Sequence, residues 1–185
     1  SVGNGASEPY QLILENSTNS VYVAGYNTGF EQWGGGAFTS NPASTWAGFV
    51  VKYNETGAFK WGRSTSGAQC VFSSCGVYFN NIVIHPEGGV VVGGNFVQTF
   101  KEQSGTINQG YGDWDVLLKR YGPNGTELWS YYAGSNGDDR LQSLAVNQKG
   151  QVQFGGTHLN NMTFGTNNLA KNSTTAYFDG FIAQI

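Results

Sequence analysis

The fold is decided by one stretch of sequence, Trp46-Ala47-Gly48-Phe49-Val50-Val51-Lys52-Tyr53-Asn54-Glu55-Thr56-Gly57-Ala58-Phe59-Lys60-Trp61, because copies of it return further along the chain. Four of its residues recur after a constant offset of 68 positions, as Trp114, Tyr121, Gly125 and Trp129. A third, shorter copy runs from Phe178 to Ile185. An internal repeat of this length is typical of arrays of one structural unit, such as solenoids and propellers. We therefore expect the chain to fold as such an array.

A pair of short apolar runs precedes each copy of this stretch, and the second run always ends in glycine. The three pairs are Leu12-Ile13-Leu14 with Val21-Tyr22-Val23-Ala24-Gly25, Ile82-Val83-Ile84 with Val90-Val91-Val92-Gly93-Gly94, and Leu144-Ala145-Val146 with Val152-Gln153-Phe154-Gly155-Gly156. Short β-branched and aromatic runs separated by Gly, Asn and Pro turns predict antiparallel hairpins. The quoted stretch is itself a hairpin that turns at residues 54–57. No segment has the apolar spacing of a helix over a useful length.

Each unit therefore has four expected strands, which predicts an all-β fold. Four antiparallel strands that repeat every 60 to 70 residues are typical of propeller blades, whose sheets bury both faces against their neighbours. We expect a single β-propeller-like array of about three four-stranded antiparallel blades, at residues 8–67, 79–137 and 139–185. The third blade lacks its fourth strand, because Ile185 aligns with the end of the third strand in the other two units.

Four of the five tryptophans occupy repeat-equivalent positions. Trp46 is equivalent to Trp114, and Trp61 is equivalent to Trp129. Because large aromatic side chains bury much apolar area, we expect all four to pack between blades rather than to form a binding site.

Composition narrows the class of protein. With 39% hydrophobic and 15% aromatic residues among 185, the chain is apolar enough to bury a sizeable core. Only 11% of residues are charged and the net charge is −3, which disfavours nucleic acid, since that affinity rests on clustered Lys and Arg. The longest apolar runs are far shorter than the roughly 20 residues of a membrane span. We therefore expect no nucleic-acid partner, no membrane span and no cofactor.

The only two cysteines, Cys70 and Cys75, bound an extra segment between the first and second units. The connection that contains them is six residues longer than the corresponding connection between the second and third units. A cysteine pair around a short insertion predicts a disulfide-closed loop and an oxidising compartment. Two free thiols and a metal-binding pair are the alternatives. Zinc is the weaker of these, because no histidine or further cysteine lies nearby.

The chain has five Asn-X-Thr triplets, where its content of Asn and Thr predicts roughly one or two by chance. The five asparagines are Asn16, Asn54, Asn124, Asn161 and Asn172. All lie in expected turns or long connections, where a sugar would cost no packing, and N-glycosylation agrees with an oxidising compartment. The alternative is that Asn, Gly and Thr simply suit turns. Asn54 and Asn124 are the strongest candidates, because they occupy equivalent turns of successive units.

These units resemble a β-propeller repeat of bacteria and archaea with an Asp-Ala-Phe-Val-Ala-Lys-Tyr block, a Gly turn, a Trp and a strand of the Gly-Asn-Val-Tyr-Val-Thr-Gly type. The matching residues are Asp179-Gly180-Phe181-Ile182-Ala183, Asp115-Val116-Leu117-Leu118-Lys119, Gly48-Phe49-Val50-Val51-Lys52-Tyr53, Trp61, Trp129, Val21-Tyr22-Val23-Ala24-Gly25 and Thr163-Phe164-Gly165. The first unit departs from the pattern, with Ala47 where the family usually has Asp. The resemblance covers nearly the whole chain and implies an extracellular or surface-attached protein without family-wide catalytic residues.

Residues that commonly carry catalysis are sparse. His85 and His158 have no matching Ser or Cys motif, so we expect both to be surface histidines. Carboxylates cluster at residues 113–115 and 138–139, but they lack the spacing of a calcium loop, and we expect them to be solvated or to cap turns. We therefore predict no catalytic residue, no metal site and no enzyme. A hydrolase or lyase built on one of these carboxylates is the least favoured alternative.

Three aromatic residues in the long connections are candidates for binding. Trp33 is the one tryptophan outside a repeat-equivalent position, and it shares a Gly-rich connection with Phe38. Exposed aromatics in such a loop, with Tyr111 on the same loop-rich face, would stack on a sugar or dock a protein. The alternative is that Trp33 packs beneath its own loop.

The favoured function is that of a non-enzymatic extracellular β-propeller repeat protein, which acts as a structural or adhesive building block of a surface. Because the third unit stops after three strands, we expect it to leave an unpaired strand edge and an apolar outer face. Copies of the chain would then complete one another in a closed ring or an open filament, unless the chain is a piece of a longer propeller. The alternative function is a lectin-like module that binds a glycan or a surface protein.

Overall fold

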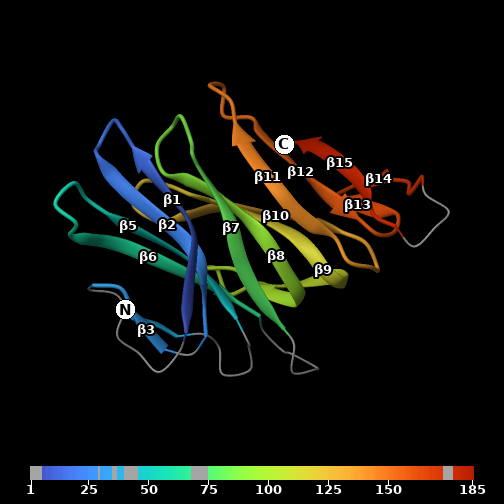
Figure 1. Ribbon diagram of the computed structural model, residues 1–185, viewed down its shortest axis with the longest axis horizontal. Helices are drawn as coiled ribbons and strands as arrows, with labels where there is room; N and C mark the ends of the chain where they lie inside the picture. The colour runs from blue at the N-terminus through green and yellow to red at the C-terminus, as the bar shows by residue number, and fades with distance from the viewer. Residues whose placement is uncertain (1–5, 29, 35–36, 40–45, 68–74, 173–176) are drawn as a thin grey trace.

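The computed structural model describes residues 6–28, 30–34, 37–39, 46–67, 75–172 and 177–185. These ranges contain no helix, and three antiparallel sheets follow one another along the chain. The first sheet lies at the left of Figure 1, the second in the middle and the third at the right. The prediction of an all-β fold is therefore confirmed.

The first sheet has four strands in the order β1-β2-β5-β6. Their bounds are β1 (Ser7–Glu15), β2 (Ser20–Asn27), β5 (Ala47–Tyr53) and β6 (Phe59–Ser66). Every neighbouring pair is antiparallel, as the hairpin pattern predicted. A separate two-stranded hairpin of β3 (Phe30–Gln32) and β4 (Ala37–Thr39) lies within the connection between β2 and β5.

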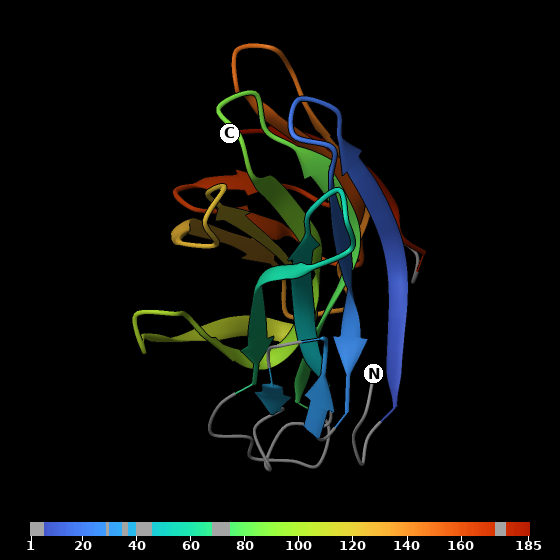
Figure 2. The ribbon, with the colours of Figure 1, turned by 90° about the vertical axis from the view of Figure 1, so that its left-hand side faces the viewer.

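The second sheet has six strands in the order β14-β13-β10-β9-β8-β7. The four expected strands are β7 (Gly76–Ile84), β8 (Val90–Lys101), β9 (Ile107–Tyr121) and β10 (Glu127–Gly134). The paired ends of β8 and β9 form a long hairpin that projects from the body of the molecule in Figure 2. Two extra strands, β13 (Met162–Phe164) and β14 (Asn167–Leu169), come from the third unit. Because β13 pairs with β10, they tie the third unit to the second sheet.

The third sheet has three strands in the order β11-β12-β15 within the described residues. They are β11 (Arg140–Val146), β12 (Val152–His158) and β15 (Asp179–Gln184), and both pairs are antiparallel. The first strands of the three sheets lie side by side, with β7 in contact with both β1 and β11 (Figure 1). Each sheet therefore starts with a strand at the same side of the array.

One β-bulge recurs at the same place in the first strand of each sheet. The residues at which the pairing slips are Tyr10 in β1, Asn80 in β7 and Gln142 in β11. Beside each bulge, a backbone carbonyl presses on a glycine of the neighbouring strand, and a Cβ on Gly94 would overlap the carbonyl oxygen of Tyr78. Gly25 and Gly156 meet the same obstacle. This close approach explains why the second apolar run of each unit ends in glycine.

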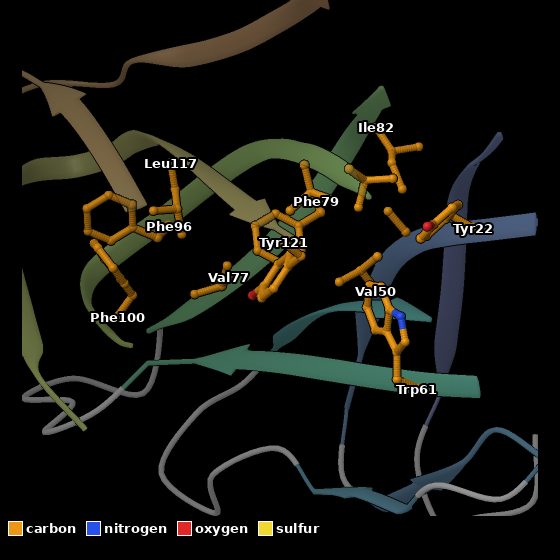
Figure 3. Packing of buried hydrophobic residues seen from close by; sticks show 13 residues of the cluster. Tyr22, Val50, Trp61, Val77, Phe79, Ile82, Phe96, Phe100, Leu117 and Tyr121 are labelled. Atoms are coloured by element: carbon orange, nitrogen blue, oxygen red, sulfur yellow. The ribbon is translucent and has the colours of Figure 1, made fainter. Parts of the chain in front are cut away.

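The core consists of side chains that fill the space between facing sheets. Figure 3 shows the cluster between the first and second sheets, whose members include Tyr22, Val50, Trp61, Val77, Phe79, Ile82 and Tyr121. A second cluster, between the second and third sheets, includes Leu118, Leu141 and Phe154. Trp61 is 7% exposed, and its indole Nε1 donates to the carbonyl oxygen of Pro123, in the turn between β9 and β10, at 2.8 Å. The prediction that Trp61 packs between units is therefore confirmed.

The two junctions between successive sheets share a backbone hydrogen bond. At the first junction, the N–H of Val77 donates to the carbonyl oxygen of Trp46 at 3.2 Å. At the second, the N–H of Asp139 donates to the carbonyl oxygen of Trp114 at 2.7 Å. Because Trp46 and Trp114 are repeat-equivalent, the same contact joins each sheet to the first strand of the next.

The buried amide of Asn95 links several strands at the second junction. Its Nδ2 donates to the carbonyl oxygens of Asp115 at 3.1 Å and Asp139 at 2.8 Å. Its Oδ1 accepts from the N–H of Leu141 at 3.2 Å and from the hydroxyl of Tyr78 at 3.2 Å. Asn95 is 0% exposed, so these four bonds use the full capacity of a side chain that has no access to water.

Both histidines are buried, so the prediction of surface histidines was wrong. His85 is 7% exposed in the turn between β7 and β8, where it lies against Gly150 in the corresponding turn of the third unit. His158 is 1% exposed, and its Nδ1 donates to the carbonyl oxygen of Asn160 at 2.7 Å. Its ring also packs against Phe181. The local sequence does not reveal this burial, because it results from contacts between neighbouring strands and units.

Candidate interaction surfaces

Of the three residues expected to form a lectin-like site, the structure places Trp33 and Tyr111 apart. Trp33 is half-buried, and its ring centroid lies 4.6 Å from that of Phe49 in the first sheet. Phe38 lies in β4, but its side chain is outside the described part of the structure. Tyr111 lies on β9 of the second sheet and is 40% exposed. Trp33 thus packs onto its own sheet, and no contact among the described residues joins it to Tyr111.

Tyr111 lines an open pocket of about 560 Å³ that is otherwise polar. The other lining residues are Ser135, Asn136, Asn160, Asn161, Thr163 and Lys171. This pocket offers hydrogen-bonding groups but little of the apolar surface that usually holds a ligand. We therefore do not regard it as the best candidate site.

One set of aromatic residues was missed by sequence reasoning. Trp46 and Trp114 are half-buried rather than sealed between sheets, and both line open pockets. Three tyrosines, Tyr10, Tyr26 and Tyr78, line one of these pockets with them. These tyrosines belong to three different strands, so no spacing along the sequence marks them as neighbours.

Asp115 is fully buried, and its carboxylate accepts hydrogen bonds from the preceding part of β9, where the pairing with β8 slips. Oδ2 accepts from the N–H groups of Tyr111 at 2.8 Å and Gly112 at 3.3 Å, whereas Oδ1 has no hydrogen-bond partner among the described residues. Burial, together with the smaller effect of nearby Asp139, raises the pKa of Asp115 to about 7 against the effect of the two hydrogen bonds. Asp115 is buried within β9, so the prediction that it is solvated or caps a turn was wrong.

Asp139 has a similar role at the start of the third unit. Its Oδ2 accepts from the backbone N–H of Ser135, and its Oδ1 accepts from that of Leu159 at 3.3 Å. Asp139 is 0% exposed, and this burial raises the pKa of its carboxyl group. Asp139 thus holds the segments that follow β10 and β12, whereas Asp115 holds an irregular part of β9.

The repeat allows equivalent apolar residues to be compared on the three sheets. Leu12 of β1 has the same register as Ile82 of β7 and Leu144 of β11. Ile82 is fully buried in the core between the first and second sheets, and Leu144 packs into the core between the second and third. Leu12, in contrast, is 62% exposed, and its neighbour Leu14 is 49% exposed. The strip of Leu12 and Leu14 is therefore uncovered where its counterparts contact another sheet.

The third sheet shows the complementary case on its outward face. Ile182 of β15 has the same register as Val50 in the first sheet and Leu118 in the second. Both counterparts are fully buried beneath the next sheet, but Ile182 is 91% exposed. Its neighbours Gln153 and Gln184 are polar, exposed and joined by a hydrogen bond of 3.0 Å. The expected apolar outer face is thus a polar face with one exposed isoleucine at its centre.

The predicted disulfide falls partly outside the described residues. Cys70 lies in the range 68–74, which the structure does not describe. Cys75 is 0% exposed and lies so close to Gly67 that a Cβ there would come within 2.8 Å of its Sγ. The pairing of Cys70 with Cys75 therefore stays a prediction.

The sequon asparagines lie where a glycan would have room, but the side chains of Asn54, Asn124 and Asn161 also accept backbone hydrogen bonds. Four are exposed and Asn54 is half-buried. The Oδ1 of Asn54 accepts from the N–H groups of Thr56 at 3.2 Å and Ala58 at 2.8 Å, which closes its turn. Asn147 is not part of a sequon, yet its Oδ1 makes the same type of bonds in its own turn. Glycosylation therefore stays a prediction, because turn closure alone also accounts for an asparagine at this position.

Within the described ranges, no group of three or more His, Cys, Asp or Glu is arranged to hold a metal ion. The same ranges contain no helix that is long and apolar enough to span a membrane. Comparison with models of protein families gave no match, and neither did comparison with curated protein sequences.

Proposed function

We propose that the chain is a non-enzymatic, extracellular β-propeller repeat module that serves as a structural or adhesive building block and associates with copies of itself. The blade arrangement is supported by the recurrence of the same bulge and the same junction hydrogen bond from unit to unit. In repeat proteins each unit contacts mainly its neighbours, so equivalent faces meet in equivalent ways. The five sequons and the cysteine pair support an extracellular location.

Self-association rests on the difference in burial between equivalent residues. The strip of Leu12 and Leu14 and the isoleucine Ile182 correspond to the two halves of an interface that the chain forms twice internally. A head-to-tail contact would place Ile182 of one copy on the strip of the next and bury both. Such a contact joins different surfaces, so it builds rings or open filaments rather than a symmetric dimer.

The two faces also fit each other in extent. The outer half of the first sheet is already covered, because Trp33 packs there against Phe49 and its neighbours. The uncovered part of the first sheet is therefore the strip on β1. The third sheet, which would contact it, has three strands and so is also narrower than a four-stranded sheet. Because Gln153 and Gln184 flank Ile182, the contact would be small and partly polar. We therefore expect weak, concentration-dependent association.

Replacing Ile182 by aspartate should abolish this association. A charge at the centre of the contact removes the apolar burial and adds a desolvation cost, so affinity should fall roughly tenfold or more. Light scattering over a concentration series should show wild-type mass rising above 19.9 kDa, while Ile182→Asp stays at that value. Leu128→Asp is the matched control, because Leu128 is an exposed apolar residue of β10 outside both faces. A wild-type chain that remains monomeric at all concentrations would contradict self-association.

Several Asn-X-Thr sites should carry glycans in protein purified from its native source. Peptide mapping with and without a glycosidase measures occupancy at each site. Asn147 is an internal control, because it occupies a similar turn without the acceptor triplet and should be unmodified. If all five sequon asparagines are unmodified, the extracellular assignment loses its main support.

A further inference from the structure

Five aromatic side chains line one surface pocket of about 290 Å³ at the junction of the first two sheets. They are Tyr10, Tyr26, Trp46, Tyr78 and Trp114, and we call this set the aromatic groove. From Tyr26 through Tyr10, Tyr78 and Trp114 to Trp46, successive ring centroids lie 5.7, 6.2, 5.2 and 6.0 Å apart. Tyr10 is 46% exposed and the other four are half-buried. The rings therefore form a continuous and accessible series.

Polar groups lie beside the two tryptophans of the aromatic groove. Trp46 and Trp114 also line a neighbouring pocket of about 470 Å³, which contains Asp113, Asp138 and Arg140. The guanidinium of Arg140 lies 4.5 Å from the ring centroid of Trp114 and forms an ion pair of 2.9 Å with Asp138. A ligand on the tryptophans would thus meet both apolar ring faces and hydrogen-bonding side chains.

The fold holds these rings in place before any ligand arrives. The backbone carbonyls of Trp46 and Trp114 accept the two junction hydrogen bonds, so both tryptophans are anchored where the sheets meet. The hydroxyl of Tyr78 donates to Oδ1 of Asn95 and accepts from Nη1 of Arg140, each at 3.2 Å. Binding to such a preorganised site costs little ordering of the protein.

The charges near the aromatic groove disfavour anionic ligands. An anion would face Glu8, whose carboxylate accepts from the hydroxyl of Tyr26 at 2.7 Å, together with Asp113 and Asp138. Arg140 already lies over a face of Trp114, so a compact cation would have to share that ring with it. A neutral ligand is not repelled by the three carboxylates. A sugar ring is neutral, has C–H faces that pack on aromatic rings, and carries hydroxyl groups along its edge.

We propose that the aromatic groove binds a neutral oligosaccharide. Sugar rings lie on Trp46, Trp114 and Tyr10, and their hydroxyl groups form hydrogen bonds with Asp113 and with the hydroxyl groups of Tyr10 and Tyr26. This activity goes beyond self-association, and it uses different residues from Leu12, Leu14 and Ile182. The two proposals therefore succeed or fail separately.

Titration with defined oligosaccharides tests this site. The probes are the β-1,4-linked glucose, α-1,4-linked glucose and β-1,4-linked mannose hexasaccharides, and binding is followed by calorimetry and by tryptophan fluorescence. At least one probe should bind, and Trp114→Ala should weaken it roughly tenfold, the loss expected for one stacked ring. Tyr10→Ala should weaken binding less. Because Tyr10 is 46% exposed, this variant should fold even if Trp114→Ala does not, and the test can still be read.

Trp129→Phe is the matched control, because Trp129 is repeat-equivalent to Trp61 and packs into the core between the second and third sheets. This variant should bind the probe as the wild type does. Binding of none of the hexasaccharides would overturn the proposal, as would binding that both Trp114→Ala and Tyr10→Ala leave intact. A preference for tetramethylammonium or for a sulfated hexasaccharide over every neutral probe would also overturn it.

Discussion

Replacement of Asn95 by alanine is expected to lower the free energy of unfolding by about 3–4 kcal/mol. The change removes four hydrogen bonds from a side chain without access to water, and it leaves the carbonyl oxygens of Asp115 and Asp139 and the N–H of Leu141 without this partner. Each buried polar group left unpaired costs about 1–3 kcal/mol, although partial relaxation reduces the sum. Urea denaturation at a concentration where the chain is monomeric measures the effect.

The matched control for this experiment is Asn136→Ala. Asn136 is exposed, so its replacement should change stability by no more than about 0.5 kcal/mol. If Asn95→Ala were as stable as this control, the amide would not hold the second junction together. The result is informative about the array, because Asn95 contacts backbone groups of both the second and the third sheets.

The second large effect is a loss of stability as the pH rises from about 4 to about 7. In the folded chain, burial raises the pKa of Asp115 from its ordinary value of 3.8 to about 7. Between these two pH values the folded state keeps a proton that the unfolded chain has released, so the stability contributed by the neutral carboxyl is full below pH 4 and is lost as pH rises through 7. At about 1.4 kcal/mol per pH unit, the loss is about 4 kcal/mol.

Asp115→Asn isolates this contribution from those of other groups. The amide oxygen of asparagine accepts the same two backbone N–H groups but does not ionise, so the pH dependence due to this position disappears. Carboxyl groups with lowered pKa, such as those of Glu15 and Glu102, act in the opposite direction but are present in both proteins. The stability of wild type relative to Asp115→Asn should therefore fall between pH 4 and 7. A difference that stays constant over this range would show that Asp115 is ionised in the folded state throughout.

The strand pattern was predictable because it repeats. The runs around Leu12, Ile82 and Leu144 each pair with the next run in an antiparallel hairpin, as expected from their spacing. The strands β3, β4, β13 and β14 were not predicted, since the connections that contain them are polar and lack a period of two. Their pairing depends on which strand edge lies within reach, and only the folded chain determines that.

The surroundings of individual side chains were less predictable than the strands. Trp61 and Trp46 recur with the same offset and so were given the same packing role, but Trp61 is buried beneath a turn of the second sheet while Trp46 lies at the rim of a groove. Likewise, Ile82 and Leu12 occupy equivalent positions, yet one is buried and the other exposed. Equivalence in a repeat fixes the direction of a side chain, but burial depends on whether a neighbouring sheet is present.

The most direct test of the central claim mixes two variants that each keep one of the proposed contact faces. Ile182→Asp retains the strip of Leu12 and Leu14, whereas the double variant Leu12→Asp, Leu14→Asp retains Ile182. Each variant alone should be a monomer of about 19.9 kDa by light scattering, and an equimolar mixture should form a dimer of twice that mass that does not grow further. Mixtures that remain monomeric under conditions where the wild type associates would show that these two faces do not contact each other.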